Sequence, residues 1–202
     1  GRVAVVGAMS EYDATTPAPG PTNFHLTLPR RLTVRGMLVS DYTDRAPGYL
    51  ARAADRLGYP RNFSIYDQAD AVRLTGYVIR DLGLDTKRFP PRSVHAAISA
   101  AKNEGLDAEV YAQRAGNLFE RKIAEVFTEY QQRLQRAGSM DFDDLLGQAL
   151  RLLREHPDVL QHYQRRFRHI LVDEYQDTNR VQYDIVLLLA ADHRNVAVVG
   201  DQ

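Results

Sequence analysis

The sequence predicts an α/β protein with a mostly helical middle and a partial parallel βαβ unit, preceded by a short β and loop segment. Apolar residues recur at helical spacing between residues 66 and 167. Two short apolar runs then flank one helical stretch between residues 169 and 199. Composition changes near residue 50, because the first 50 residues hold 9 of the 52 charged residues but five of the nine prolines. We therefore expect three parts, which are residues 1–50, 51–166 and 167–202.

The first part offers little regular structure. Residues 2–6 are typical of a buried strand, residues 16–22 of a proline-rich loop, and residues 32–39 of a second strand. No helical period links them, so this part is too small to form a domain alone.

The middle part is expected to be all helical. Asp67 can cap a first helix that stops at Gly83, and the pair Pro90 and Pro91 opens a second that ends near Gly105. Each helix has one apolar face, as expected for packing on a common core.

A longer helix should begin at Asn117 and stop at Gly138, followed by two more over residues 141–154 and 158–167. The sequence His156-Pro157 separates the last two. The residues of the long helix expected to face inward are Leu118, Phe119, Ile123, Val126, Phe127, Tyr130 and Leu134.

The last part changes period again. Residues 169–172 and 196–199 are apolar runs, and residues 179–191 between them are helical, which predicts two parallel strands joined by a right-handed crossover. Asp173 and Glu174 then lie at the carboxyl end of a parallel strand, where ligands of open α/β sheets bind.

An apolar strand that ends on two adjacent carboxylates is typical of ATP-driven nucleotide hydrolases. Asp173 could hold Mg²⁺, often through water, while the metal bridges phosphate oxygens. Glu174 would then orient or deprotonate the attacking water. Alternatively, the two acidic residues after the strand merely cap the next helix, for which Asp177, Thr178 or Asn179 could be the N-cap.

Composition excludes several classes of function. The 26 basic residues balance 26 acidic ones, so there is no bulk positive field for nucleic acid. The absence of Cys and the scatter of the six His argue against a zinc site. No apolar stretch approaches about 18 residues, so we expect a cytoplasmic protein. None of the three Lys follows a Gly, and no GxxxxGK[ST] phosphate loop occurs.

The string DEYQDTN, residues 173–179, resembles motif II of the UvrD/Rep/PcrA family of superfamily 1 DNA helicases. Residues 198–201 resemble the beginning of motif III, and the whole resemblance covers about residues 55–202. The upstream segments that agree, in the family's order, are residues 61–67, 102–103, 140–146 and 167–172. The resemblance implies an ATP-dependent 3′-to-5′ DNA-unwinding motor with two RecA-like domains, the first carrying a helical insertion.

Carried over by position, Asp173 would ligate Mg²⁺ and Glu174 would be the catalytic base. Gln176 would help link the nucleotide site to the DNA side. The implied cofactors are ATP and Mg²⁺, and the implied partner is single-stranded or partly duplex DNA. The run Asp141-Phe142-Asp143-Asp144 also allows a structural interpretation, as a helix start rich in acidic residues that favour the positive end of the helix dipole.

Several parts of the family pattern are absent from the 202 residues. They are the phosphate loop with its Lys, the early adenine-reading segment, everything after the opening of motif III, and the second motor domain. Gln202 is not given the role of sensing the γ-phosphate, because the family's residue would come slightly later. We therefore expect a helicase fragment that is inactive alone.

Residues 1–50 resemble something else, the cofactor-domain C-terminal stretch of zinc-independent medium-chain NADP-dependent reductases. The segments that carry this resemblance are residues 1–12, 20–24 and 35–42. It would place Tyr12 and Asn23 near a nicotinamide, although a loop Tyr more often packs on a strand. The junction near residues 48–56 suggests a chimera of two incomplete enzymes.

Two alternatives to the helicase fragment stay open at this point. One is a remnant of an NADP-dependent oxidoreductase, from residues 1–50. The other is a non-catalytic helical interaction module made of residues 66–167.

Overall fold

The described part of the chain forms two compact units. In the computed structural model, residues 3–6, 34–36 and 54–200 are described. One unit holds the described residues from 54 to 150, and the other holds residues 3–6, 34–36 and 151–200. Tyr12, Asn23 and the expected loop over residues 16–22 lie outside the described residues.

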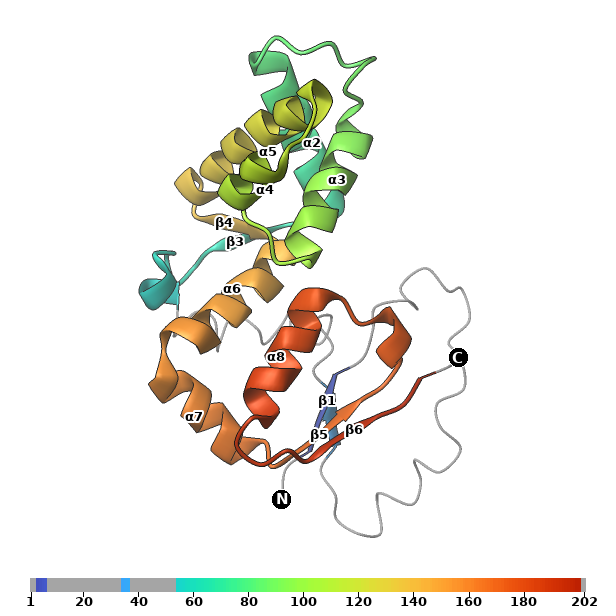
Figure 1. Cartoon of the computed structure of the whole chain (residues 1–202). Helices are drawn as coiled ribbons and strands as arrows, with labels where there is room; N and C mark the ends of the chain where they lie inside the picture. Colours follow the sequence, from blue (N-terminus) through green and yellow to red (C-terminus); the bar gives the residue numbers. More distant parts are fainter. Residues whose placement is uncertain (1–2, 7–33, 37–53, 201–202) are drawn as a thin grey trace. The chain divides into compact units, whose positions relative to one another are not determined.

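Three helices build the helical unit, α2 (Gln68–Asp81), α3 (Pro91–Asn103) and α5 (Leu118–Arg136). They pack against one another (Figure 1). Their buried core consists of Ala71, Val78, Ile79, Phe89, Val94, Ile98, Ala101, Ile123, Val126, Phe127, Tyr130 and Leu134. All three helices were predicted from their apolar spacing.

The predicted caps of these helices are confirmed. The Asp67 carboxylate accepts a hydrogen bond from the Asp70 amide at 2.8 Å, and the Asn117 side chain accepts one from the Glu120 amide at 2.9 Å. Both bonds satisfy amides that have no partner within the first turn. Gly83 follows the end of α2 at φ 66°, in the left-handed conformation that a glycine adopts without steric cost.

The expectation of an all-helical middle was wrong in one respect. Strands β3 (Ser64–Tyr66) and β4 (Ser139–Asp141) pair in parallel, with Ile65 opposite Met140. Three residues are too few to establish the alternation of polar and apolar residues that identifies a strand. Asp141 therefore ends a strand, and α6 begins one residue later, as Phe142–Glu155.

Two further differences concern the surface of the helical unit. A short helix, α4 (Ala108–Arg114), was not predicted, because it buries no residue and so lacks an apolar period. Leu118 and Phe119 were expected to face inward, but they are 65% and 42% exposed. Phe119 instead stacks on Phe89, with ring centroids 4.9 Å apart.

The second unit contains the predicted βαβ arrangement, β5 (His169–Val172), α8 (Arg180–Ala190) and β6 (Val196–Val198). Both strands are parallel, with Ile170 opposite Val196. The four-stranded parallel sheet has the order β2-β1-β5-β6, in which β1 is Val3–Val6 and β2 is Val34–Gly36.

Helices α7 (Pro157–Arg166) and α8 pack together next to this sheet (Figure 1). The Gln164 side chain donates a hydrogen bond to the Leu188 carbonyl at 2.9 Å. Val181, Ile185 and Leu189 are the buried face of α8, and Ile170 and Val172 are the buried residues of β5. None of the helices in the described part of the chain is long and apolar enough to cross a membrane.

Gly138, directly before β4, leaves little room for a side chain. Its φ is 58°, and an added Cβ would lie 2.8 Å from Cγ of Pro60. We expect Gly138→Ala to lower the free energy of unfolding by about 1–2 kcal/mol for the left-handed backbone. Displacement of the Pro60 ring should add about 1–3 kcal/mol.

Gly83→Ala is the matched control, because its φ is 66° but nothing lies within 4 Å of the added Cβ. Urea unfolding should show a smaller loss for Gly83→Ala than for Gly138→Ala. Equal losses would show that the contact with Pro60 contributes nothing.

Candidate active site

The two predicted carboxylates lie where the sequence placed them. Strand β5 ends at Val172, which is buried, and the half-buried Asp173 and Glu174 follow at the carboxyl end of the parallel sheet. This end of a parallel sheet is the usual position of ligands in open α/β folds.

The backbone of Glu174 is unusual. Its φ of 50° and ψ of 46° are left-handed values, which cost a residue with a side chain about 1–2 kcal/mol. The Glu174 amide donates to Oδ1 of Asp173 at 3.0 Å, and the Asp177 amide donates to the Glu174 carbonyl at 2.9 Å. Strained residues of this kind concentrate at functional sites.

The turn after Glu174, the 3₁₀ helix η3 (Tyr175–Asp177), is bonded to the end of β6. The Tyr175 amide donates to the Val199 carbonyl at 2.9 Å, and the Val199 amide donates to the Val172 carbonyl at 2.8 Å. A Cβ at Gly200 would lie 3.2 Å from the Tyr175 amide nitrogen and would collide with the Gln176 side chain. Only glycine permits this close approach.

Gln176 holds one oxygen of Glu174. Its Nε2 donates a short hydrogen bond, 2.5 Å long, to Oε2 of Glu174. The bond orients the Glu174 carboxylate relative to the turn. Gln176 thus joins Glu174 to the start of the motif-III-like segment at Gly200.

Asp173 and Glu174 do not cap helix α8. Asn179 caps α8, since its side chain accepts from the Gln182 amide at 2.8 Å and its own amide donates to the Gln182 side chain at 2.9 Å. Asn179, one of the N-caps that the alternative interpretation named, is thus confirmed, whereas neither carboxylate of the acidic pair caps α8. Asp173 instead accepts a hydrogen bond from the Glu174 amide, and Glu174 accepts one from Gln176.

The chemistry of these side chains fits a hard cation. Neither Asp173 nor Glu174 forms an ion pair with any residue that the structure describes. Carboxylate oxygens are the ligands that Mg²⁺ prefers. The described residues contain no cluster of three or more His, Asp or Glu suited to a metal, so phosphate and water oxygens would have to complete the coordination.

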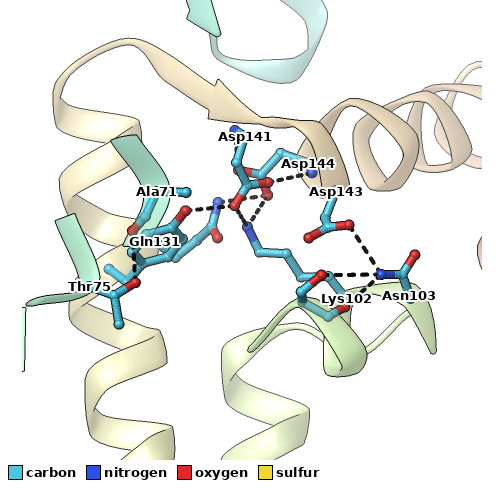
Figure 2. Close-up of polar contacts among 10 residues, drawn as sticks. Ala71, Thr75, Lys102, Asn103, Gln131, Asp141, Asp143 and Asp144 are labelled. Carbon is cyan, nitrogen blue, oxygen red and sulfur yellow. Dashed lines mark hydrogen bonds and ion pairs between the residues drawn. The ribbon is translucent and has the colours of Figure 1, made fainter. Parts of the chain in front are cut away.

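A second polar group, far from this sheet in sequence, lies inside the helical unit. The Lys102 ammonium is buried and donates to Oδ2 of Asp141 at 2.7 Å and to Oδ1 of Asp144 at 2.8 Å (Figure 2). The Tyr130 hydroxyl donates to Asp141 at 2.8 Å, and the Gln131 amide donates to Asp144 at 3.0 Å. We call these five residues the Lys102 cluster.

The two aspartates also cap α6 reciprocally. The Asp144 amide donates to Oδ1 of Asp141 at 2.8 Å, and the Asp141 amide donates to Oδ2 of Asp144 at 3.2 Å. The predicted acidic helix start is thus confirmed. The sequence analysis did not identify Lys102 as the partner of this helix start. Its position four residues after the buried Ile98, on the apolar face of α3, could have indicated that Lys102 is buried.

Burial and neighbouring charges shift the pKa values of the residues in the Lys102 cluster. Burial opposes charge on Lys102, but Asp144 and Asp141 outweigh it and hold the pKa of Lys102 above its usual value. Burial also opposes charge on Asp141, yet Lys102 holds its pKa below the usual value. For Asp144 burial prevails and raises the pKa. Burial and the charge of Asp141 raise the pKa of Tyr130.

The chain is similar to known helicases over most of its length. The profile of the UvrD/REP helicase N-terminal domain matches residues 33–202. The match therefore starts inside the segment 1–50, which also resembles a reductase.

Individual helicases agree with the profile. ATP-dependent DNA helicase PcrA of Bacillus subtilis is 42% identical over 163 residues, which are 81% of this chain and 22% of that protein. PcrA of Leuconostoc citreum is 45% identical over 167 residues, 83% of this chain and 22% of that protein. ATP-dependent DNA helicase UvrD1 of Mycobacterium tuberculosis is 46% identical over 157 residues, 71% of this chain and 20% of that protein. The chain thus spans about a fifth of the length of these relatives.

Removal of the buried ammonium should strongly destabilise the helical unit. In Lys102→Met two carboxylates would stay buried without their cation, and we expect a loss of about 3–5 kcal/mol in the free energy of unfolding. Lys122→Met is the control, because Lys122 pairs with Glu125 at the surface and should cost about 0–1 kcal/mol. The losses of both variants can be measured by urea unfolding. Similar losses in the two would contradict a structural role for the Lys102 cluster.

The cluster should also make stability depend on alkaline pH. Lys102 and Tyr130 keep their protons to higher pH in the folded chain than in the unfolded chain. Their contribution is therefore fully present below about pH 10 and is lost as the pH rises further. Tyr130→Phe should make the free energy of unfolding fall less steeply with pH, as measured by urea unfolding between about pH 8 and 11. An unchanged slope would show that Tyr130 takes no part in it.

Proposed function

Because this chain belongs to the UvrD/REP helicase family, we propose that it forms part of a DNA-unwinding motor and supplies carboxylates that act in ATP hydrolysis. The observation that carries the proposal is the placement of Asp173 and Glu174 at the carboxyl end of β5, with Glu174 held by Gln176.

In this proposal Asp173 would hold Mg²⁺, directly or through water, and that ion would supply positive charge to the phosphates of ATP. The Glu174 carboxylate, oriented by Gln176, accepts a proton from the attacking water. Glu174 also has a left-handed backbone, a conformation that concentrates at functional sites.

Gln176 is proposed to carry information between sites. It contacts Glu174 on one side and lies against Gly200 on the other. Movement of the segment after β6 would therefore move the amide that orients Glu174. Such a contact is a physical means for DNA binding to alter hydrolysis.

The larger assignments follow from family membership. The helical part of residues 51–166 is proposed to be mostly an insertion in the motor domain, and residues 167–202 part of the domain that hydrolyses ATP. The partner would be single-stranded or partly duplex DNA, unwound from 3′ to 5′ in repair or replication. The 202-residue polypeptide lacks a GxxxxGK[ST] sequence, and we propose that it does not hydrolyse ATP by itself.

A paramagnetic cation can test the metal role in the chain itself. Mn²⁺ takes the same oxygen ligands as Mg²⁺ and broadens nearby amide signals. In NMR spectra recorded with Mn²⁺ and ATP, we expect broadening of residues 172–176 in the wild-type chain. Asp173→Asn should abolish it, because the variant loses the charged ligand.

The control is Asp192→Asn, since Asp192 is an exposed carboxylate in the turn before β6 and has no role in the proposal. Its removal should leave the broadening at residues 172–176 unchanged. Broadening spread equally over surface carboxylates, or unaffected by Asp173→Asn, would refute the assignment of Asp173.

A further inference from the structure

A shallow pocket opens directly after the acidic pair in the sheet-containing unit. Its volume is about 240 Å³, and it is lined by Tyr175, Thr178, Asn179, Arg180 and Tyr183. The first three residues belong to the turn after Glu174, and the other two to the first turn of α8. The carboxylates of Asp173 and Glu174 have been given a role above, but these side chains have not.

Two aromatic faces are exposed in this pocket. Tyr175 is 40% exposed and Tyr183 is 36% exposed. The guanidinium of Arg180 lies over the Tyr183 ring, 6.0 Å from its centroid. Exposed aromatic rings next to a cation are the usual platform on which unpaired bases stack.

Among the residues that line the pocket, only Arg180 is charged. Nε of Arg180 lies 3.1 Å from Oδ1 of Asp184, and Arg154 lies 2.8 Å from Oδ2 of the same carboxylate. Two guanidinium groups thus share one carboxylate, and no acidic residue lines the pocket. The terminal amino groups of Arg180 have no hydrogen bond partner among the described residues, so they can donate to a phosphate.

We propose that this pocket binds one nucleotide of single-stranded DNA, with the base stacked on the tyrosines and the phosphate held by Arg180. The pocket is smaller than the roughly 300–1,000 Å³ of sites for drug-sized ligands, so it suits one nucleotide unit. Duplex DNA cannot offer an unstacked base face. This inference rests on the proposed function and adds a DNA contact next to the turn that carries Glu174.

The test is binding of a labelled oligothymidylate of about ten nucleotides to the full 202-residue chain, measured by fluorescence anisotropy. We expect Tyr183→Ala and Arg180→Gln each to raise the Kd about tenfold, and Tyr183→Phe to leave it nearly unchanged because the ring remains. Arg180→Gln should also reduce the dependence of log Kd on log salt by about 0.7, the loss of one phosphate contact.

Helix α2 provides a matched control. Arg80 lies over the ring of Tyr77 at 5.0 Å, and Tyr77 is 46% exposed, but neither residue lines the pocket described above. Tyr77→Ala and Arg80→Gln should leave the Kd unchanged. An equal loss in both pairs would show that exposed Arg and Tyr bind DNA without a site, and would overturn the proposal.

A second measurement does not depend on variants. On titration of the wild-type chain with the same oligonucleotide, amide signals of residues 175–183 should shift. Binding without these shifts, or with Kd values unchanged in the pocket variants, would overturn the pocket and leave the proposed function standing. No binding at all would also overturn the pocket, whereas failure of Mn²⁺ broadening at Asp173 would count against the proposed function alone.

Discussion

Burial of the Lys102 ammonium is the constraint on which the helical unit depends. An ammonium group removed from water is tolerated only when its charge and its hydrogen bonds are matched, and here two aspartates meet both needs. The same aspartates cap α6, and Tyr130 and Gln131 anchor them to α5. One electrostatic requirement therefore fixes α3, α5 and the start of α6 together.

The sheet-containing unit obeys a different constraint, which is the arrangement of polar groups at the ends of parallel strands. The backbone bonds between Val199 and its neighbours in β5 and η3 bring the end of β6 against the turn after Glu174. Catalytic groups in such folds gain precision from this rigid backbone.

Sequence reasoning worked where one signal dominated. The amphipathic period located α2, α3 and α5, and the string after β5 located Asp173 and Glu174. It did not find the pairing of β3 with β4, because parallel partners 75 positions apart leave no local mark. Nor did it find Lys102, since a long-range ion pair has no periodicity.

The left-handed backbone of Glu174 has a consequence for evolutionary change at this position. Glycine would adopt φ 50° without steric cost, so drift from Glu to Gly would relieve strain and favour the folded state. The same change would remove the carboxylate. Under the catalytic role proposed for Glu174, selection for stability and selection for activity act in opposite directions on one codon, and the persistence of Glu there would record selection for activity.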